Sequence, residues 1–135
     1  MLKKWLRWFD RRPQKRLSRQ DLGEYGETLA ESELRKRGYR IIERNYRCKL
    51  GEIDIVCKDA DEIVIVEVKT RASRAYGSPQ DSITASKARK LMTLGSNYLA
   101  ENGIPDAQWR IDVVAIMIES EGRPCIEVIP NAVQG

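Results

Sequence analysis

The chain has 135 residues, of which 41% are hydrophobic, and a formal net charge of +4. This length suits one domain with a single core, and the sequence contains no apolar run of about 18 residues, the length that predicts a membrane-spanning helix. Histidine is absent, which excludes Ser-His-Asp and Cys-His catalysis, histidine-ligated zinc and a histidine general base. Any chemistry must therefore come from carboxylates, lysine, hydroxyls or thiols.

The basic charge is concentrated at the start of the chain. Residues 1–20 contain eight Lys and Arg against one acid, a net +7, whereas the remaining 115 residues contain 16 bases and 19 acids, a net −3. Trp5, Trp8 and Phe9 lie among these bases, and Pro13 interrupts any long helix. A solvated extension, an interfacial helix and an arm on a phosphate backbone all fit this composition.

The first residues of the chain and its cysteines indicate the cellular compartment of the protein. The first residues, "MLKKWLRWFDRRPQ", lack the continuous apolar core and the small-residue cleavage site of a secretory signal. Cys48, Cys57 and Cys125 are odd in number and lack the spacing of a metal site, so we expect reduced thiols. These features predict a cytoplasmic protein.

The first predicted element after the extension is a helix over residues 22–37. Asp21 and Glu24 have the spacing of a capping box, and Gly38 ends the apolar pattern. Glu27 lies at the border of the apolar stripe, from which its carboxylate can point into a cleft. The stripe itself consists of Leu22, Tyr25, Leu29, Ala30 and Leu34.

The later elements are three strands, a segment of loop composition, a second amphipathic helix and two more strands. Their predicted ranges are 39–44, 47–57, 63–69, 70–81, 82–101, 109–119 and 124–129. The inner face of the second helix has Ile83, Leu91, Met92, Tyr98 and Leu99, and its outer face has Lys87, Arg89 and Lys90. The order α-β-β-β-α-β-β predicts an α/β fold with a mixed sheet flanked by helices.

The second and third strands are expected to form an antiparallel hairpin that turns at Ala60 and Asp61, inside the polar break "KDADE". In that register Asp54 faces Glu67, and Glu52 faces Lys69. Because side chains alternate along a strand, all four charges project from one face of the hairpin. The opposite face is then wholly apolar and consists of Ile53, Ile55, Cys57, Val64, Val66 and Val68.

Two facing carboxylates destabilise a sheet unless a proton or a cation compensates them. Lys69 is one available cation. Carboxylates from two strands, joined by Glu27 from the helix, also suit Mg²⁺ or Mn²⁺. The alternative is a set of exposed strand ion pairs, which contribute little to stability. The apolar context of Glu67 in "IVIVEVK" favours a metal site over surface charges.

Asp54, followed thirteen residues later by Glu67-Val68-Lys69, resembles the PD-(D/E)xK motif of restriction-endonuclease-like nucleases, which include Holliday-junction resolvases. The segments "GEYGETLAESELRKRGYRIIERNYRCKLGEIDIV" and "VIVEVKTRASRAYGSP" are similar to the bacterial YraN family of endonuclease-like proteins over about residues 21–118. Ile53 stands where the motif has proline, a departure that this family shares. The resemblance implies a restriction-endonuclease-like core in a domain over residues 21–135, preceded by the extension at 1–20.

The resemblance further implies a metal-dependent endonuclease that hydrolyses phosphodiesters. Asp54 and Glu67 would bind Mg²⁺ or Mn²⁺ with the help of the Val68 carbonyl. Glu27 would be an outer or additional ligand, and Lys69 would orient or activate the attacking water. These roles agree with metal-assisted hydrolysis and need no histidine.

The expected partner is nucleic acid, with DNA favoured over RNA and branched or distorted forms favoured over a specific sequence. Arg71, Lys87 and Arg74 are the candidate phosphate contacts, and simple surface charge is the alternative for each. A non-catalytic binding module on a nuclease-like fold stays open, as does a homodimer. Peripheral membrane contact through residues 1–20 is disfavoured.

Overall fold

The computed structural model describes residues 18–72, 83–118 and 123–133. Residues 1–17 of the extension predicted over 1–20, and the candidate Arg74, lie outside these ranges. Two helices and five strands follow the predicted order α-β-β-β-α-β-β, so the α/β class is confirmed. They are α2 (Arg19–Lys36), β1 (Arg40–Cys48), β2 (Gly51–Asp59), β3 (Glu62–Arg71), α3 (Ala85–Glu101), β4 (Trp109–Met117) and β5 (Cys125–Ile129).

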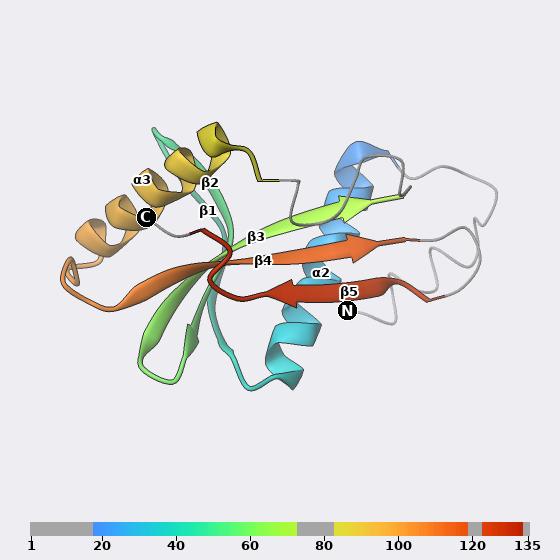
Figure 1. The fold of residues 1–135 in the computed structure, drawn as a ribbon, viewed down its shortest axis with the longest axis horizontal. Coiled ribbons are helices and arrows are strands. Elements are labelled where there is room, and N and C mark those ends of the chain that lie inside the picture. Colours follow the sequence, from blue (N-terminus) through green and yellow to red (C-terminus); the bar gives the residue numbers. More distant parts are fainter. Residues whose placement is uncertain (1–17, 73–82, 119–122, 134–135) are drawn as a thin grey trace.

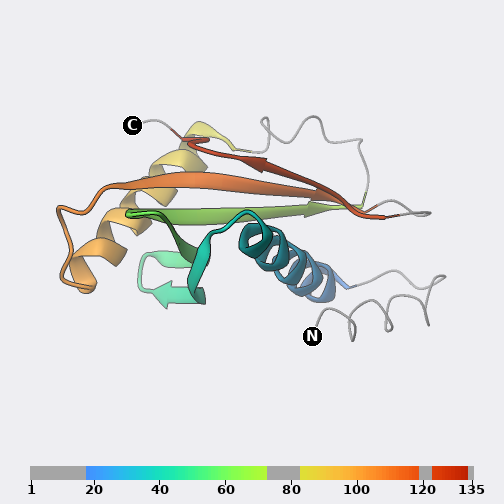
Figure 2. The ribbon, with the colours of Figure 1, turned by 90° about the horizontal axis from the view of Figure 1, so that it is seen from below.

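The five strands form one mixed sheet in the order β1-β2-β3-β4-β5 (Figure 1). Only β3 and β4 are parallel, and α3 is the crossover between them. Helix α2 lies against one side of the long strands, as Figure 2 shows, and α3 packs on the other face. This arrangement suits the restriction-endonuclease-like core that the sequence suggested. Neither described helix is long and apolar enough to cross a membrane.

Helix α2 begins three residues earlier than predicted. Its N-cap is Ser18, whose hydroxyl accepts the N–H of Asp21 at 3.0 Å and donates to the Asp21 carboxylate at 2.8 Å. The expected cap at Asp21 is therefore wrong, because a capping pair of the same spacing exists one turn earlier. The predicted end at Gly38 is confirmed, since this glycine has a φ of 92°.

The boundary between the first two strands is also corrected. The predicted strand over 47–57 includes Lys49 and Leu50, but these residues form the turn that joins β1 to β2. Gly51 follows the turn with a φ of 144°, a conformation that side chains disfavour. Residues up to Cys48 therefore belong to β1, and β2 starts at Gly51.

Two apolar clusters stabilise the sheet, one on each face. The α2 cluster includes Ile55, Cys57, Val64 and Val66 of the sheet, and the α3 cluster includes Val56, Ile63 and Ile65, as alternation predicts. Ile53 is the exception, because it packs in the α3 cluster and not with Ile55. The predicted wholly apolar face is therefore wrong at this one position. Ile53 and Ile55 point to opposite faces of the sheet, although they are two residues apart on the same strand.

Helix α2 lies very close to β3 at Gly26. A Cβ atom placed on Gly26 would lie 1.8 Å from the Oγ1 of Thr70, whereas a Cβ on Gly23 would meet nothing within 4 Å. We predict that Gly26→Ala lowers the free energy of unfolding by about 1–3 kcal/mol through overpacking. Gly23→Ala should instead raise it by up to about 1 kcal/mol, since alanine is the better helix former. Urea denaturation of both variants tests this, and shifts of the same sign would contradict it.

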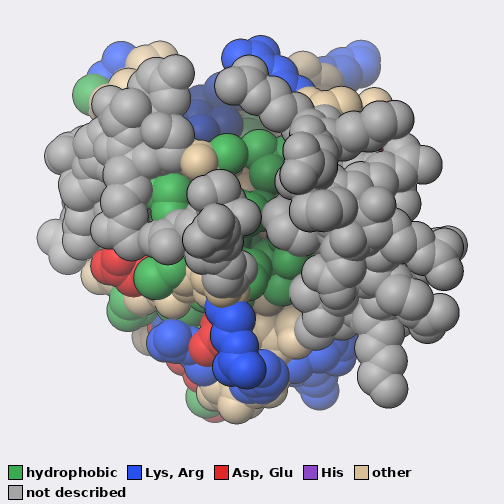
Figure 3. All heavy atoms as spheres, turned by 90° about the vertical axis from the view of Figure 1, so that its right-hand side faces the viewer, with side chains coloured by type: hydrophobic (Ala, Val, Ile, Leu, Met, Phe, Trp, Pro, Cys, Tyr) green, Lys and Arg blue, Asp and Glu red, His purple; other side chains and the backbone are tan. Residues whose placement is uncertain are grey.

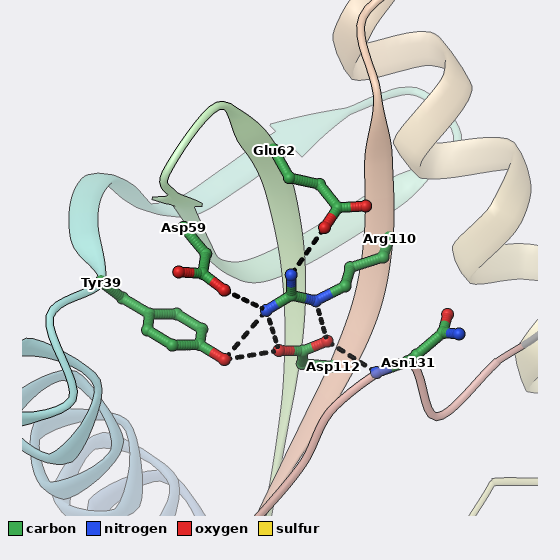
Figure 4. Close-up of polar contacts among 6 residues, drawn as sticks. All are labelled: Tyr39, Asp59, Glu62, Arg110, Asp112 and Asn131. Carbon is green, nitrogen blue, oxygen red and sulfur yellow. Dashed lines mark hydrogen bonds and ion pairs between the residues drawn. The ribbon is translucent and has the colours of Figure 1, made fainter.

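The turn end of the β2–β3 hairpin contains a buried polar network around Arg110 (Figure 4). The guanidinium binds the Asp112 carboxylate at 2.9 Å and also contacts Asp59 at 3.0 Å and Glu62 at 2.7 Å. Asp112 is fully buried and also accepts the backbone N–H of Asn131 at 2.9 Å. The network therefore joins the hairpin to β4 and to the chain that follows β5.

Candidate functional site

The predicted register of the β2–β3 hairpin is confirmed along its paired length. The turn lies at Ala60 and Asp61, and the pairing runs from Asp59 opposite Glu62 to Ile55 opposite Val66. Beyond that pair the ladder ends, and Figure 1 shows the β1–β2 hairpin turning toward α3 while β3 continues beside β4. The site residues lie where the two strands part.

Asp54 is the first β2 residue past the end of this ladder. Its Oδ2 atom accepts the backbone N–H of Val68 at 2.8 Å. The Asp54 side chain thus accepts a hydrogen bond that a backbone carbonyl would accept in a regular strand pair. Burial raises the pKa of Asp54 to about 7, and the neighbouring Glu67 carboxylate adds to this rise, while the Val68 N–H opposes it. The expected proximity of these two carboxylates is thus present, although Asp54 and Glu67 do not pair through their backbones.

Glu67 is the most buried carboxylate of the site, with only 5% of its surface exposed. Two ammonium groups approach the same oxygen, its Oε2 atom. The Nζ of Lys87 on α3 lies 3.2 Å away, and the Nζ of Lys69 on β3 lies 3.5 Å away. A buried carboxylate is strongly destabilising without such partners. Lys87, expected at phosphate, therefore contacts a site carboxylate in this structure.

The predicted pairing of Glu52 with Lys69 is wrong, because the β2–β3 ladder ends before it. Glu52 faces Arg47 of β1 and forms an exposed ion pair with it at 3.7 Å. Lys69 instead pairs with Glu67 on its own strand. Of the four charged residues predicted to share one face of the hairpin, Asp54, Glu67 and Lys69 lie together at the site. Glu52 lies next to β1 instead.

Glu27 reaches the site from the α2 face. Its Oε1 atom lies 3.6 Å from Arg44 of β1, which also contacts Glu31 at 3.5 Å. Burial raises the pKa of Glu27, although the Arg44 charge acts in the opposite direction. Its charge also adds to the rise at Asp54. The position at the border of the apolar stripe is confirmed, since the side chain is mostly but not fully buried, with 17% of it exposed.

Asn45 is a site residue that the sequence reasoning missed. It lies between Arg44 and Tyr46, which pair with Ile55 and Ile53, and is therefore opposite Asp54. Its φ of 55° is in the left-handed region, which asparagine tolerates better than most residues. With its amide nitrogen turned toward the neighbouring acceptors, Asn45 donates to Glu52 at 3.0 Å and to Glu27 at 3.1 Å.

The irregular backbone at Asn45 explains why Ile53 changes face. A left-handed residue interrupts the alternation of β1 there, and β2 follows through its pairing with β1. Asp54 thus lies between Ile53, which packs on the α3 face, and Ile55, which packs on the α2 face. The signal in the sequence was the asparagine itself, at the break between the strands predicted over 39–44 and 47–57, since asparagine is depleted in strands.

The donor set can be compared with the needs of a metal ion. Within residues 18–72, 83–118 and 123–133, no three Asp, Glu or Cys side chains form a ready-made metal cage. Mg²⁺, however, is commonly bound through one or two carboxylates together with waters and substrate phosphates. Burial is the main cause of the raised pKa of Asp54, and repulsion from Glu67, the second cause, is the charge excess that a cation would relieve. The carboxylates of Asp54 and Glu67 therefore fit a hard divalent ion.

The remaining candidates lie near the ends of β3 and α3. Arg71 is the last residue of β3, half-buried and opposite Met117 of β4. Figure 3 views the end of the molecule at which β3 and β4 terminate, where apolar side chains lie centrally and Lys and Arg at the margins. Tyr46 of β1 packs edge-on against Tyr98 of α3, with ring centroids 5.0 Å apart.

The raised pKa of Asp54 predicts a stability that depends on pH. Because the folded-state pKa of about 7 exceeds the ordinary value of 3.8, protonated Asp54 contributes stability below about pH 4 that is lost as pH rises to 7. Asp54→Asn removes this titration, so it should be more stable than the parent by about 1–3 kcal/mol at pH 8. The gain should shrink toward pH 4. Urea denaturation across this range tests it, and a gain independent of pH would contradict it.

Comparison with known proteins identifies relatives across most of the chain. The model of a family described as "Uncharacterised protein family UPF0102" matches residues 26–116. A UPF0102 protein of Moorella thermoacetica is 44% identical over 117 residues, which cover 86% of this chain and 98% of the relative. A UPF0102 protein of Pelobacter propionicus is 48% identical, and the match covers 82% of this chain and 80% of the relative. A UPF0102 protein of Geobacter metallireducens is 46% identical, and the match covers 86% of this chain and 94% of the relative.

Proposed function

The chain belongs to the uncharacterised protein family UPF0102, and from that premise we propose that it is a divalent-metal-dependent endonuclease that hydrolyses phosphodiesters of DNA. UPF0102 is the family of the YraN resemblance, which is thereby confirmed. The names of its members state no activity, so the proposal rests on the site. The observation that carries it is the pair of partly or fully buried carboxylates, Asp54 and Glu67, beside Lys69.

Each residue of the proposed site has a separate task. Asp54 and Glu67 would hold Mg²⁺ or Mn²⁺, with Glu27 as an outer or additional ligand. When bound, such an ion polarises a phosphoryl oxygen and lowers the pKa of a bound water. The Val68 N–H keeps the Asp54 carboxylate in place from the neighbouring strand. Lys69, on the same strand face as Glu67, would stabilise the negative charge that develops on the phosphate.

The proposed substrate is DNA in a branched or otherwise distorted form. The net charge of −3 over residues 21–135 argues against a broad basic surface that would wrap a regular duplex. Arg71, Lys87 and Arg74 are the proposed phosphate contacts, and the basic residues up to position 20 would add electrostatic attraction. Three unpaired cysteines agree with the cytoplasm as the proposed location.

A panel of DNA and RNA structures, incubated with Mg²⁺ or Mn²⁺, tests the proposal. The panel contains linear duplex, single strand, flap, fork and four-way junction, each with and without a chelator. Metal-dependent cleavage of at least one DNA is the expected result, and it should disappear with the chelator. Cleavage that is unaffected by the chelator would contradict the proposed chemistry.

One observation favours a second candidate, a nuclease-like fold that binds nucleic acid without cutting it. The Glu67 charge is already balanced by two lysines, so this carboxylate has partners without a metal. Binding of the same DNA panel with equal affinity in metal and in chelator, and without cleavage, would favour this binding module over the nuclease.

A further inference from the structure

We propose that Lys87 is the resident counter-ion of Glu67 in the metal-free protein, and that a divalent cation entering the site displaces it. This inference rests on the proposed function, because it assigns a regulatory role at the same site. It differs from the role suggested by the sequence, in which Lys87 only contacts phosphate. Lys87 would instead compete with the metal for one oxygen atom.

The competition follows from the contacts of the Glu67 Oε2 atom. Lys87 Nζ lies 3.2 Å from it and Lys69 Nζ lies 3.5 Å from it, so two ammonium groups surround a carboxylate that is 5% exposed. A metal ion bound to the same oxygen would stand within a few ångströms of both. Like charges at that separation repel strongly when they are partly shielded from water. At least one lysine must therefore move when the metal binds.

Lys87 is better placed to leave than Lys69. Lys69 lies two residues from Glu67 on the same strand, so the geometry of β3 keeps it near that carboxylate. Lys87 approaches from another element, the first turn of α3, so the geometry of β3 does not hold it beside Glu67. Its backbone N–H is held by the N-cap Thr84 at 3.1 Å, so its side chain can rotate into water without unwinding the helix.

The helix position supports the same conclusion. The partial positive charge at the beginning of a helix disfavours a cation in the first turn, and the first turn of α3 contains no acidic residue. Glu67 is the carboxylate that compensates Lys87 there. If a metal ion bound Glu67, Lys87 would lose this ion pair and could pair with a nucleic-acid phosphate. Metal binding and phosphate binding would then strengthen one another.

Substitutions at Lys87 separate this role from that of a general surface charge. Lys87→Met removes the competing ammonium and should lower the dissociation constant for Mn²⁺ by about tenfold, the order expected for one close like-charge contact. Lys87→Arg keeps the charge and should behave like the parent. Lys90→Met is the matched control, since Lys90 is exposed on the same helix and its side chain packs over Gly51.

The experiment is calorimetric titration of Mn²⁺ into the full chain and its three variants without nucleic acid, with circular dichroism as a check of folding. If Lys87→Met does not fold, Lys87→Gln takes its place. Tighter Mn²⁺ binding by Lys87→Met alone supports the inference. Equal Mn²⁺ affinities for Lys87→Met and Lys90→Met overturn it and leave the proposed function standing. Absence of Mn²⁺ binding in every protein overturns both.

Discussion

Asp54→Asn and Glu67→Gln are each expected to lower the rate of metal-dependent DNA cleavage by about 10³-fold, a magnitude typical of losing one group that stabilises transition-state charge. Both substitutions keep the shape of the side chain and remove its negative charge. The Asn side chain can still accept the Val68 N–H, so the local fold should persist. The measurement is single-turnover cleavage of the best substrate of the panel, in Mg²⁺ and in Mn²⁺.

Glu127→Gln supplies the matched control for these two variants. Glu127 is an exposed carboxylate on the edge strand β5, opposite Ala115, and its loss should leave the cleavage rate within about twofold. Cleavage that survives both Asp54→Asn and Glu67→Gln would assign the activity to another site or to a contaminant. A loss of cleavage that accompanies unfolding would be distinguished by circular dichroism.

The combination of activity and stability sharpens this test. Asp54→Asn should inactivate the protein and yet stabilise its fold at pH 8, because it removes a buried charge and the repulsion between that charge and Glu67. Opposite effects on function and stability are expected where a site is arranged for a ligand and not for the fold. A loss of stability at pH 8 on this substitution would contradict the expected cost of the buried Asp54 charge.

Arg110→Met is expected to lower the free energy of unfolding by about 3–5 kcal/mol, as is usual when one partner of a buried ion pair is removed. The substitution would leave the Asp112 carboxylate, which is fully buried, without its guanidinium. Asp59 and Glu62 would lose their shared partner at the hairpin turn (Figure 4). Urea denaturation at pH 7 measures the effect.

Arg35→Met is the control for this second prediction. Arg35 pairs with Glu31 at 3.2 Å, but 58% of its side chain is exposed, so its loss should cost no more than about 0.5 kcal/mol. Adding Asp112→Asn to Arg110→Met should recover part of the lost stability, since the orphaned charge is then removed. Equal effects of Arg110→Met and Arg35→Met would show that burial adds nothing to the network.

The two clusters occupy opposite ends of the same hairpin and have opposite electrostatic character. About five strand residues, or roughly 16 Å, separate the turn at Asp59 and Glu62 from Asp54 and Glu67. At the turn end, one guanidinium is surrounded by hydrogen-bonding partners that raise the pKa of Arg110, chiefly Asp112. At the other end, burial and a second carboxylate raise the pKa of Asp54 instead. The first cluster stabilises the fold, and the second carries the proposed chemistry.

The sequence by itself determined the elements, the α/β class and the hairpin register. These depend on local information, namely the periodicity of apolar residues, the polar turn at Ala60 and Asp61, and the alternation of side chains along strands. The same local information identified Asp54, Glu67 and Lys69 as a set, because their strand spacing does not depend on the rest of the molecule.

Tertiary structure alone decided which partners these charges have. The β2–β3 ladder ends at Ile55 and Val66, close to Asn45 of β1 and its backbone φ of 55°, and residue types alone do not show where a strand pairing stops. Ile53 lies on the other face, and Glu52 is separated from Lys69 and pairs with Arg47. Lys87 reached Glu67 only because α3 crosses over the sheet, a contact between residues twenty positions apart whose geometry depends on packing and not on local pattern.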